Sequence, residues 1–403
     1  MKDLAHRQDH WSLESPLFPR HMSFLVGPRQ CGKTTLAMTY LQARGFSPRD
    51  YYFNWDRADV RQRFREDINW LSALKVHGKR PPLIFDEIHK VRQWKRLLKG
   101  VYDQYRDDFQ FIVTGSGRLD HFQRGGDSLA GRFDSYFLMP FTPGEIAGVE
   151  PIKALSLKGL QQAKSVSESV ISQWEVTGGF PEAFLSGSEL KAKAWWKNYK
   201  QRVSEEDFRD LTRLESADLM RQMIDLLPSR VSAPLSIQSV REDLETSFAT
   251  AKRYISTLNQ LYLTFDVAPY SKRIHRAIKK EKKLYFFHHP CVLDPGARHE
   301  NMVALVLKRW IHEQNEKAEG DYELNYLRDQ DRREVDFIIL KDRAPVLLVE
   351  AKLSDLNASA SLRYYSEKLK IPGIQVIRPS GVFSLKDPHL ATVSLGHLAG
   401  ALG

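Results

Sequence analysis

The chain has 403 residues, of which 42% are hydrophobic and 27% charged, and its formal net charge is +10. It is too long for one ordinary core, and no stretch approaches the ~20 apolar residues that a membrane-spanning helix needs. The N-terminal stretch MKDLAHRQDHWSLE lacks the apolar segment of a secretory signal. The two cysteines, Cys31 and Cys291, have neither a disulfide-framework nor a zinc spacing. We therefore expect a globular protein of the reducing cytoplasm, with no membrane partner.

Short apolar strands alternate with amphipathic helices from about residue 21 to 145. This alternation predicts a parallel sheet flanked by helices. We expect strands at 21–26, 51–55, 81–87 and 109–116, and helices at 33–43 and 91–106.

The first expected strand runs into GPRQCGKT, which matches the P-loop pattern G-x-x-x-x-G-K-[ST] at a strand-to-helix junction. Glycines let backbone N–H groups curl around phosphates, and the helix N-terminus adds positive charge. Lys33 should reach the β- and γ-phosphates, and Thr34 should bind Mg²⁺. The alternative is a chance glycine-rich turn. The expected contacts to ATP come from Gly27, Pro28, Arg29, Gln30, Cys31, Gly32, Lys33, Thr34 and Thr35.

Two adjacent carboxylates end the apolar strand PPLIFDE. Asp86 is placed to hold the Mg²⁺, and Glu87 to orient or deprotonate the attacking water. The alternative is an acidic strand end that caps the next helix. Together with the P-loop, the pair predicts an ATPase with Glu87 and Lys33 as catalytic residues.

Three polar residues farther along complete the candidate nucleotide site. The strand FQFIVTGS ends in Thr114 and Ser116, which can touch the γ-phosphate or the lytic water, or can cap a turn. Arg132, in DSLAGRF, is a candidate sensor or a finger that reaches a neighbouring nucleotide. A surface salt bridge is an equal alternative for Arg132.

The motifs GPRQCGKTTLA, LIFDEIHK, VTGS, SLAGRF…LMPFTPGEI and GGFPE resemble those of a prokaryotic family of AAA+ P-loop ATPases. In that family, a C-terminal domain of unknown function begins with a winged helix and ends in a restriction-endonuclease-like fold. The resemblance covers about residues 20 to 380. It implies binding and hydrolysis of ATP, and, since AAA+ relatives often form rings, it makes a homo-oligomer a candidate assembly.

The sequence from 149 to 287 predicts a helical region followed by a winged helix-turn-helix. A polar connection and a helical lid are expected over 149–228. Helices at 236–245 and 248–263 precede strands at 264–270 and 282–287. Thr250, Lys252 and Arg253 begin the second helix and could contact DNA, while Tyr254, Leu258 and Leu261 should form its buried face. The basic run from Ser271 to Lys283 favours nucleic acid, although a solvated strand edge or a protein-binding module would look the same.

The stretch REVDFIILKDRAPVLLVEAK predicts two strands around a polar turn. Endonucleases of the PD-(D/E)xK kind place an acid on the first strand and Glu-x-Lys on the second, with an earlier helix often adding a Glu. Here these residues would be Asp336, Glu350, Lys352 and Glu300. Glu350 and Lys352 share a strand face, and two carboxylates there could bind a second Mg²⁺ or a Mn²⁺. A solvated hairpin explains the same charges.

One departure from the family pattern follows KKLYF. The chain has FHHPCV where an acid is common, and we interpret His288 and His289 as structural residues.

Together these readings predict an α/β protein with four parts. They are a P-loop ATPase core over 1–148, a linker and helical lid over 149–228, a winged helix-turn-helix over 229–287, and an endonuclease-like α/β domain over 288–403. One hypothesis is an ATPase that acts on DNA through a nuclease-like domain. The other is an ATP-controlled switch or scaffold in which that domain is inactive and binds a protein or nucleic-acid partner.

Overall fold

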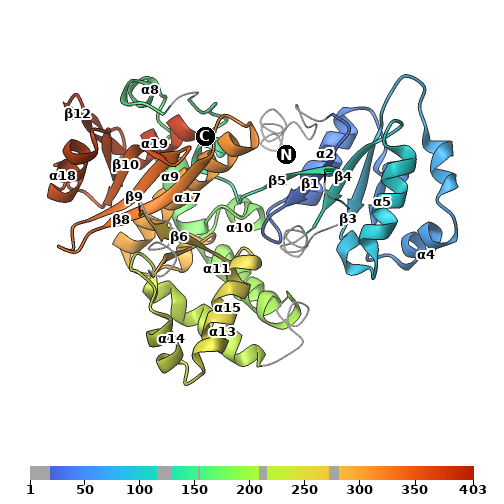
Figure 1. Cartoon of the computed structure of the whole chain (residues 1–403), viewed down its shortest axis with the longest axis horizontal. Helices are drawn as coiled ribbons and strands as arrows, with labels where there is room; N and C mark the ends of the chain where they lie inside the picture. The colour runs from blue at the N-terminus through green and yellow to red at the C-terminus, as the bar shows by residue number, and fades with distance from the viewer. Residues whose placement is uncertain (1–18, 116–128, 130, 153–154, 208–215, 272–280) are drawn as a thin grey trace. The chain divides into compact units, whose positions relative to one another are not determined.

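The computed structural model describes residues 19–115, 129, 131–152, 155–207, 216–271 and 281–403. The chain forms two compact units, Met1–Met139 and Pro140–Gly403. Figure 1 shows both, with the first in blue and cyan and the second in green to red. Among the described residues, no helix is both long and apolar enough to cross a membrane.

The first unit is built on a parallel sheet with strand order β2-β3-β4-β1-β5. Strands β1, β3 and β4 are buried along their whole length, which is typical of a sheet with both faces covered. Strand β4 lies between β1 and β3, so three strand ends that carry polar residues are neighbours. The strands are β1 (Met22–Val26), β2 (Tyr52–Asn54), β3 (Pro82–Asp86), β4 (Gln110–Thr114) and β5 (Phe133–Phe137).

Helices flank this sheet, as the alternating pattern predicts. The Tyr102 ring of α5 packs edge-on against Phe111 of β4, with ring centroids 5.5 Å apart. Strand β5 and helix α4 were not expected from the sequence. The helices are α2 (Lys33–Ala43), α3 (Pro48–Tyr51), α4 (Ala58–Glu66) and α5 (Trp94–Tyr105), with 3₁₀ turns at Asn69–Leu74 and Ile88–Lys90.

The second unit begins with a helical region. The predicted connection over 149–169 contains α8 and the start of α9, and the described parts of residues 170–230 are mostly helical. These helices are α7 (Pro143–Ile146), α8 (Leu157–Gln162), α9 (Glu168–Thr177), α10 (Pro181–Leu185), α11 (Glu189–Arg202) and α13 (Ala217–Leu226), with a π-helical turn at Val203–Asp207 and a 3₁₀ turn at Leu227–Arg230.

An eight-stranded mixed sheet forms the rest of the second unit, in the order β12-β13-β11-β10-β9-β8-β6-β7. Helices α17 and α18 pack on it (Figure 1). The remaining elements are α14 (Ile237–Asp243), α15 (Phe248–Gln260), β6 (Thr264–Pro269), β7 (Lys283–Phe286), the 3₁₀ turn His289–Cys291, α17 (Pro295–Glu316), β8 (Tyr322–Arg328), β9 (Glu334–Lys341), β10 (Ala344–Lys352), α18 (Ala360–Leu369), β11 (Gly373–Ile377), β12 (Phe383–Asp387), β13 (Leu390–Ser394) and α19 (Leu395–Leu402).

The expected order helix, helix, strand, strand is present as α14, α15, β6 and β7. These strands do not form a separate wing, however, because β6 also pairs with β8 at Ala268 and Pro269. The boundary at 287/288 therefore separates strands that belong to one continuous sheet.

The hairpin β9–β10 forms where the sequence predicts it. Its turn is made by Asp342 and Arg343, whose φ angles of 50° and 66° are those of a tight two-residue hairpin turn. The register pairs Phe337 with Val349, so Asp336 faces Glu350 across the two strands.

The second glycine of the GGFPE motif, Gly179, lies in close backbone contact with Phe141 in the second unit. The N–H of Phe141 donates to the carbonyl of Gly179 at 2.7 Å, and Trp174 Nε1 donates to the carbonyl of Phe141 at 2.8 Å. A Cβ atom on Gly179 would lie 2.1 Å from the Phe141 oxygen. Only glycine fits between these backbone segments.

We predict that Gly179→Ala destabilises the second unit by about 1–3 kcal/mol, because the added methyl must push two hydrogen-bonded segments apart. Urea unfolding followed by tryptophan fluorescence measures this change. The matched control is Gly100→Ala in α5, where a Cβ meets nothing within 4 Å, so that substitution should be neutral or stabilising. If the two variants had the same free energy of unfolding, the close contact between Gly179 and Phe141 would be contradicted.

Candidate functional site

The P-loop joins β1 to α2 at the carboxyl end of the first sheet. Gly27 and Gly32 have φ angles of 144° and 96°, which side chains with a Cβ rarely adopt. A Cβ on Gly27 would lie 2.2 Å from the Leu138 oxygen. The two glycines of the motif therefore allow a loop whose backbone can curl closely around a phosphate.

Lys33 lies inside this loop and is 7% exposed. Its ammonium donates to the carbonyl oxygens of Gly27 and Pro28, at 3.1 and 2.6 Å. The loop carbonyls thus hold the ammonium of Lys33 within the turn that the sequence assigns to phosphates.

The carboxylate of Asp86 accepts hydrogen bonds from three elements. Thr34 Oγ1 of α2 donates to Oδ2 at 3.1 Å, and the Tyr52 hydroxyl of β2 donates to the same oxygen at 2.7 Å. Thr114 of β4 donates to Oδ1. The structure therefore brings together three of the predicted residues, Thr34, Asp86 and Thr114.

Tyr52 is a site residue that sequence reasoning missed. Burial, followed by its hydrogen bond to Asp86, raises the pKa of Tyr52 well above its usual range. The phenol therefore stays protonated and remains a donor. Its only sequence signal was a polar tip on a strand beside the one that ends in Asp86.

The oxygen atoms of Thr34 and Asp86 fit a Mg²⁺ ion. A hydroxyl and a carboxylate oxygen 3.1 Å apart, beside a phosphate-binding loop, are the ligand types that Mg²⁺ takes together with phosphate oxygens and water.

Glu87 follows Asp86 in a left-handed conformation with φ of 60°. Its N–H donates to the Thr114 carbonyl at 3.0 Å, which fixes the backbone. Glu87 Oε2 lies 3.4 Å from Lys90 Nζ and 3.6 Å from His89 Nε2. A non-glycine residue in this region costs about 1–3 kcal/mol, and such strain is concentrated at functional sites.

Two predicted residues, Ser116 and Arg132, are not among the residues that the structure brings to Asp86. Ser116 is outside the described residues. Arg132 immediately precedes β5, and its carbonyl accepts from the N–H of Met22 at the start of β1, so it lies at the edge of the sheet opposite the P-loop. Arg132 Nε pairs with Asp103 at 3.0 Å, which is the salt-bridge alternative. A role toward a neighbouring copy's nucleotide stays a prediction.

The acids predicted for the nuclease site gather in the second unit. Glu300 of α17, Glu334 and Asp336 of β9, and Glu350 of β10 form what we call the carboxylate cluster. Lys352 Nζ pairs with Glu350 Oε1 at 2.9 Å, as expected from their shared strand face. The backbone N–H of Ala351 donates to Asp336 Oδ2 at 2.9 Å.

Lys283 of β7, a residue that the sequence reading placed in the basic run, lies at the centre of this cluster. Its ammonium is 2.7 Å from Glu334 Oε1, 3.0 Å from Glu300 Oε1 and 3.2 Å from Asp336 Oδ1. The Lys283 side chain is fully buried, so it is not available to DNA.

The described ranges hold no group of three or more His, Cys, Asp or Glu residues arranged to bind a metal ion. The predicted second metal is therefore not supported by the geometry of the second unit.

Burial and mutual repulsion raise the pKa values of two of these acids. Burial, and then the Asp336 carboxylate, raise the pKa of Glu300 to about 7, and the same two causes raise the pKa of Glu350 to about 7. Carboxylates that share a site cannot all be ionised cheaply. Tyr285 and Ser232 donate to the two oxygens of Glu300, the first at 2.6 Å.

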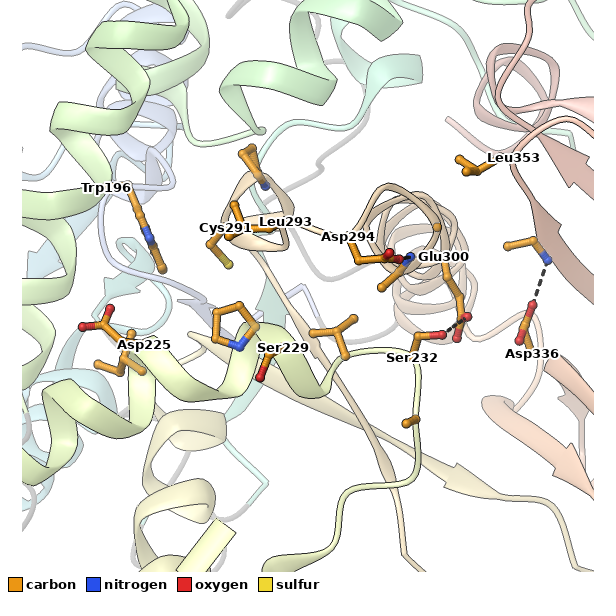
Figure 2. Close-up of a pocket in the computed structure, with 18 of the residues that line it drawn as sticks. Trp196, Asp225, Ser229, Ser232, Cys291, Leu293, Asp294, Glu300, Asp336 and Leu353 are labelled. Carbon is orange, nitrogen blue, oxygen red and sulfur yellow. Dashed lines mark hydrogen bonds between the residues drawn. The ribbon is translucent and has the colours of Figure 1, made fainter. Parts of the chain in front are cut away.

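Three members of the carboxylate cluster, Glu300, Glu334 and Asp336, form one wall of a cavity of about 1020 Å³ in the second unit. Figure 2 shows the Ser232–Glu300 hydrogen bond and Asp336 on this side, with Trp196 and Asp225 on the opposite side. Five carboxylates and three lysine ammonium groups line the cavity. Leu293, which also lines it, is 84% exposed.

His288 and His289 are buried in aromatic surroundings. The His288 ring stacks on Trp196 with ring centroids 4.5 Å apart, and His289 Nε2 lies 3.0 Å from the Trp174 carbonyl oxygen. Burial lowers the pKa of both rings, so both are neutral at pH 7. This is the structural role expected of them.

Helix α15 presents two basic residues to solvent. Lys252 and Arg253 are exposed, and Thr250 is half-buried. Tyr254, Leu258 and Leu261 are buried, as predicted. Most of the predicted basic run, residues 272–280, lies outside the described residues.

Three consecutive parts of the chain match known protein families. Residues 19–147 match an AAA domain, residues 169–289 match "Domain of unknown function (DUF8612)", and residues 295–391 match "Domain of unknown function (DUF4143)". The chain therefore contains an AAA-type P-loop ATPase domain followed by two domains of unknown function.

Relatives are similar along most of the chain. "Uncharacterized protein Rv2008c" of Mycobacterium tuberculosis (strain ATCC 25618 / H37Rv) is 22% identical over 370 residues, 88% of this chain and 76% of that protein. "Uncharacterized protein MJ1637" of Methanocaldococcus jannaschii is 25% identical over 387 residues, 85% of this chain and 78% of that protein. The solved structure "The walker-type atpase paby2304 of pyrococcus abyssi" is 15% identical, with a TM-score of 0.41, over 72% of this chain and 93% of that one.

The raised pKa values predict how the stability of the second unit depends on pH. The pKa values of Glu300 and Glu350 are raised from 4.5 to about 7. Between these two pH values the folded chain therefore keeps protons that the unfolded chain releases. Their stabilising contribution is complete below about pH 4.5 and is lost as the pH rises to about 7.

We expect wild type to lose stability relative to Glu350→Gln between pH 5 and pH 8, measured as free energies of unfolding in urea. Glu323→Gln on β8 is the control, because Glu323 is exposed. If wild type and Glu350→Gln show the same pH dependence, the raised pKa is wrong.

Proposed function

We propose that the first unit hydrolyses ATP in a Mg²⁺-dependent reaction. The observation that carries the proposal is the Asp86 carboxylate, which Thr34, Tyr52 and Thr114 hold beside the P-loop. Donors from three elements hold this carboxylate in position for a cation, and Tyr52 and Thr114 can keep their hydrogen bonds when the cation binds. The match of residues 19–147 to an AAA domain supports the same activity.

Each side chain then has a distinct part in the reaction. The ammonium of Lys33 exchanges the carbonyls of Gly27 and Pro28 for the β- and γ-phosphate oxygens of ATP. Thr34 and Asp86 would hold the Mg²⁺, which neutralises the charge of the β- and γ-phosphate oxygens when it is bound. Glu87 orients the attacking water and accepts its proton, and Thr114 keeps Asp86 aligned.

We also propose that ATP hydrolysis acts on DNA through the second unit, with α14 and α15 as a helix-turn-helix. Lys252 and Arg253 are exposed at the start of α15, where the second helix of such a motif meets the major groove. The net charge of +10 favours the same partner. Cys31 and Cys291 do not form a disulfide, which agrees with a proposed cytoplasmic location.

The alternative is an ATP-controlled switch or scaffold whose second unit binds a protein. The large cavity beside the carboxylate cluster favours it, because five carboxylates are a poor surface for a phosphate backbone.

We predict that Lys33→Ala abolishes ATP turnover, and that Glu87→Gln lowers kcat by about 10²–10⁴-fold while it leaves ATP binding largely intact. The reason is that Lys33 binds phosphate, whereas Glu87 acts on water. Phosphate release measures turnover, and a fluorescent ATP analogue measures binding.

The matched control for this pair is Arg106→Ala. Arg106 is exposed and follows α5 near the start of β4, at the sheet edge opposite the P-loop. Its turnover should equal that of wild type. Normal hydrolysis by Lys33→Ala would overturn the assignment of the P-loop.

The proposal for DNA predicts a salt-dependent affinity. Lys252→Ala/Arg253→Ala should weaken binding to any duplex and reduce the slope of log K against log salt by about 2, because each phosphate contact contributes about 1. Fluorescence anisotropy with a labelled duplex at several salt concentrations measures the slope.

The control Lys158→Ala/Lys386→Ala removes the same charge from exposed positions of the second unit. It should leave the slope unchanged. Absence of DNA binding by wild type at low salt would refute the DNA proposal and favour the protein-binding switch.

A further inference from the structure

We infer that Lys283 is the built-in cation of the carboxylate cluster, and that its ammonium takes the place that a divalent metal would have in a nuclease of this kind. The second unit then binds its partner without a metal ion at these acids. The inference does not rest on ATP hydrolysis, because it concerns the second unit alone.

The geometry of Lys283 matches that of a bound cation. An ammonium group has three N–H donors, and three carboxylate oxygens from three residues surround it at 2.7 to 3.2 Å. The donors and acceptors are thus equal in number. The side chain is fully buried, so water does not compete for these bonds.

Strand β7 fixes the position of this ammonium. Lys283 pairs with Val267 of β6 in the sheet. Tyr285 follows two residues later on the same strand face and donates to Glu300 Oε1 at 2.6 Å. Because Lys283 and Tyr285 are two residues apart on one strand, both side chains reach Glu300 of α17. Both are held by the strand and not by a loop.

The four oxygens of Glu300 and Asp336 are already engaged by donors of the chain, whereas Glu350 Oε2 is buried and accepts no hydrogen bond from the described residues. Glu300 Oε1 accepts from Lys283 and Tyr285, and Oε2 accepts from Ser232. Asp336 Oδ1 accepts from Lys283, and Oδ2 accepts from the N–H of Ala351. A divalent ion would have to displace these donors and would lie against a like charge.

Electrostatics keep Lys283 charged in this position. Burial alone would lower the pKa of its ammonium. The attraction of the nearby carboxylates outweighs burial and raises the pKa above its usual range; these are Glu300, Asp336 and Glu334. A buried charge is tolerated when it is paired and fully hydrogen-bonded. The ammonium is therefore a permanent cation at any physiological pH.

The cluster is nevertheless open to a ligand on its other side. Glu300, Glu334 and Asp336 line the cavity of about 1020 Å³, together with Lys352. Lys283 itself does not line it. The acids thus present a surface whose charge is partly neutralised from behind, which suits binding rather than metal-assisted cleavage.

The experiment uses the full chain without nucleotide and measures binding of Mn²⁺ by electron paramagnetic resonance, together with the Tm. Wild type should show no Mn²⁺ binding that depends on Asp336, so wild type and Asp336→Asn should give the same titration. The change in Tm between EDTA and Mn²⁺ should also be the same for wild type and Asp336→Asn.

Lys283→Met removes the ammonium and keeps the length of the side chain. We expect it to lower the Tm in EDTA, and to create a stoichiometric Mn²⁺ site that raises the Tm by about 5–10 °C when Mn²⁺ is about 100 times its Kd. Lys283→Met/Asp336→Asn should lose this gain. Lys283→Arg, which keeps the charge, should bind no Mn²⁺.

Two results would overturn the inference. One is binding of Mn²⁺ by wild type that disappears in Asp336→Asn. The other is a folded Lys283→Met that binds no Mn²⁺. If Lys283→Met does not fold, the comparison of wild type with Asp336→Asn still shows whether the carboxylate cluster binds Mn²⁺. None of these results affects the assignment of the P-loop.

Discussion

A charge inside a protein must be matched by an opposite charge or by hydrogen-bond donors, and this requirement organises both units. In the first unit, Asp86 at a buried strand end draws donors from α2, β2 and β4. In the second unit, Lys283 draws acids from α17 and β9. In each case one buried charge determines how several elements of the sheet and its helices meet.

The two solutions differ in what they leave for a ligand. Asp86 is satisfied by neutral hydroxyl groups, so it keeps its negative charge available to a cation. The acids around Lys283 have their cation already, supplied by the chain itself. On the two proposals made above, the same residue types would bind an ion in one unit and exclude it in the other.

The nucleotide site could be predicted because its signals are local. The P-loop is contiguous, and the order of apolar strands places Asp86 beside it through the rule that parallel strands end at one edge. The strand that carries Tyr52 was expected, but nothing in its sequence indicates that the Tyr52 hydroxyl contacts Asp86. Strand β5 was missed because the polar pattern of Phe133–Phe137 carries little periodicity.

The second unit was less accessible to sequence reasoning because its contacts span long distances. Asp336 and Glu350 were placed correctly, since a hairpin fixes their register. Lys283 was correctly expected in a strand, but it was also assigned to an exposed basic run, because its neighbours in sequence are basic while its partners lie 17 to 53 residues away. Strands β8, β12 and β13 and helix α19 were not expected, and β6 and β7 extend the sheet instead of forming a separate wing.

The position of Thr114 between two functional strands has a further consequence for the catalytic cycle. Thr34 must turn from Asp86 toward a bound cation, but Thr114 and Tyr52 can keep their bonds to the same carboxylate. The orientation of Asp86 is then established when the sheet forms and need not be found again at each turnover. Preorganisation of this kind moves the entropic cost of alignment from catalysis to folding.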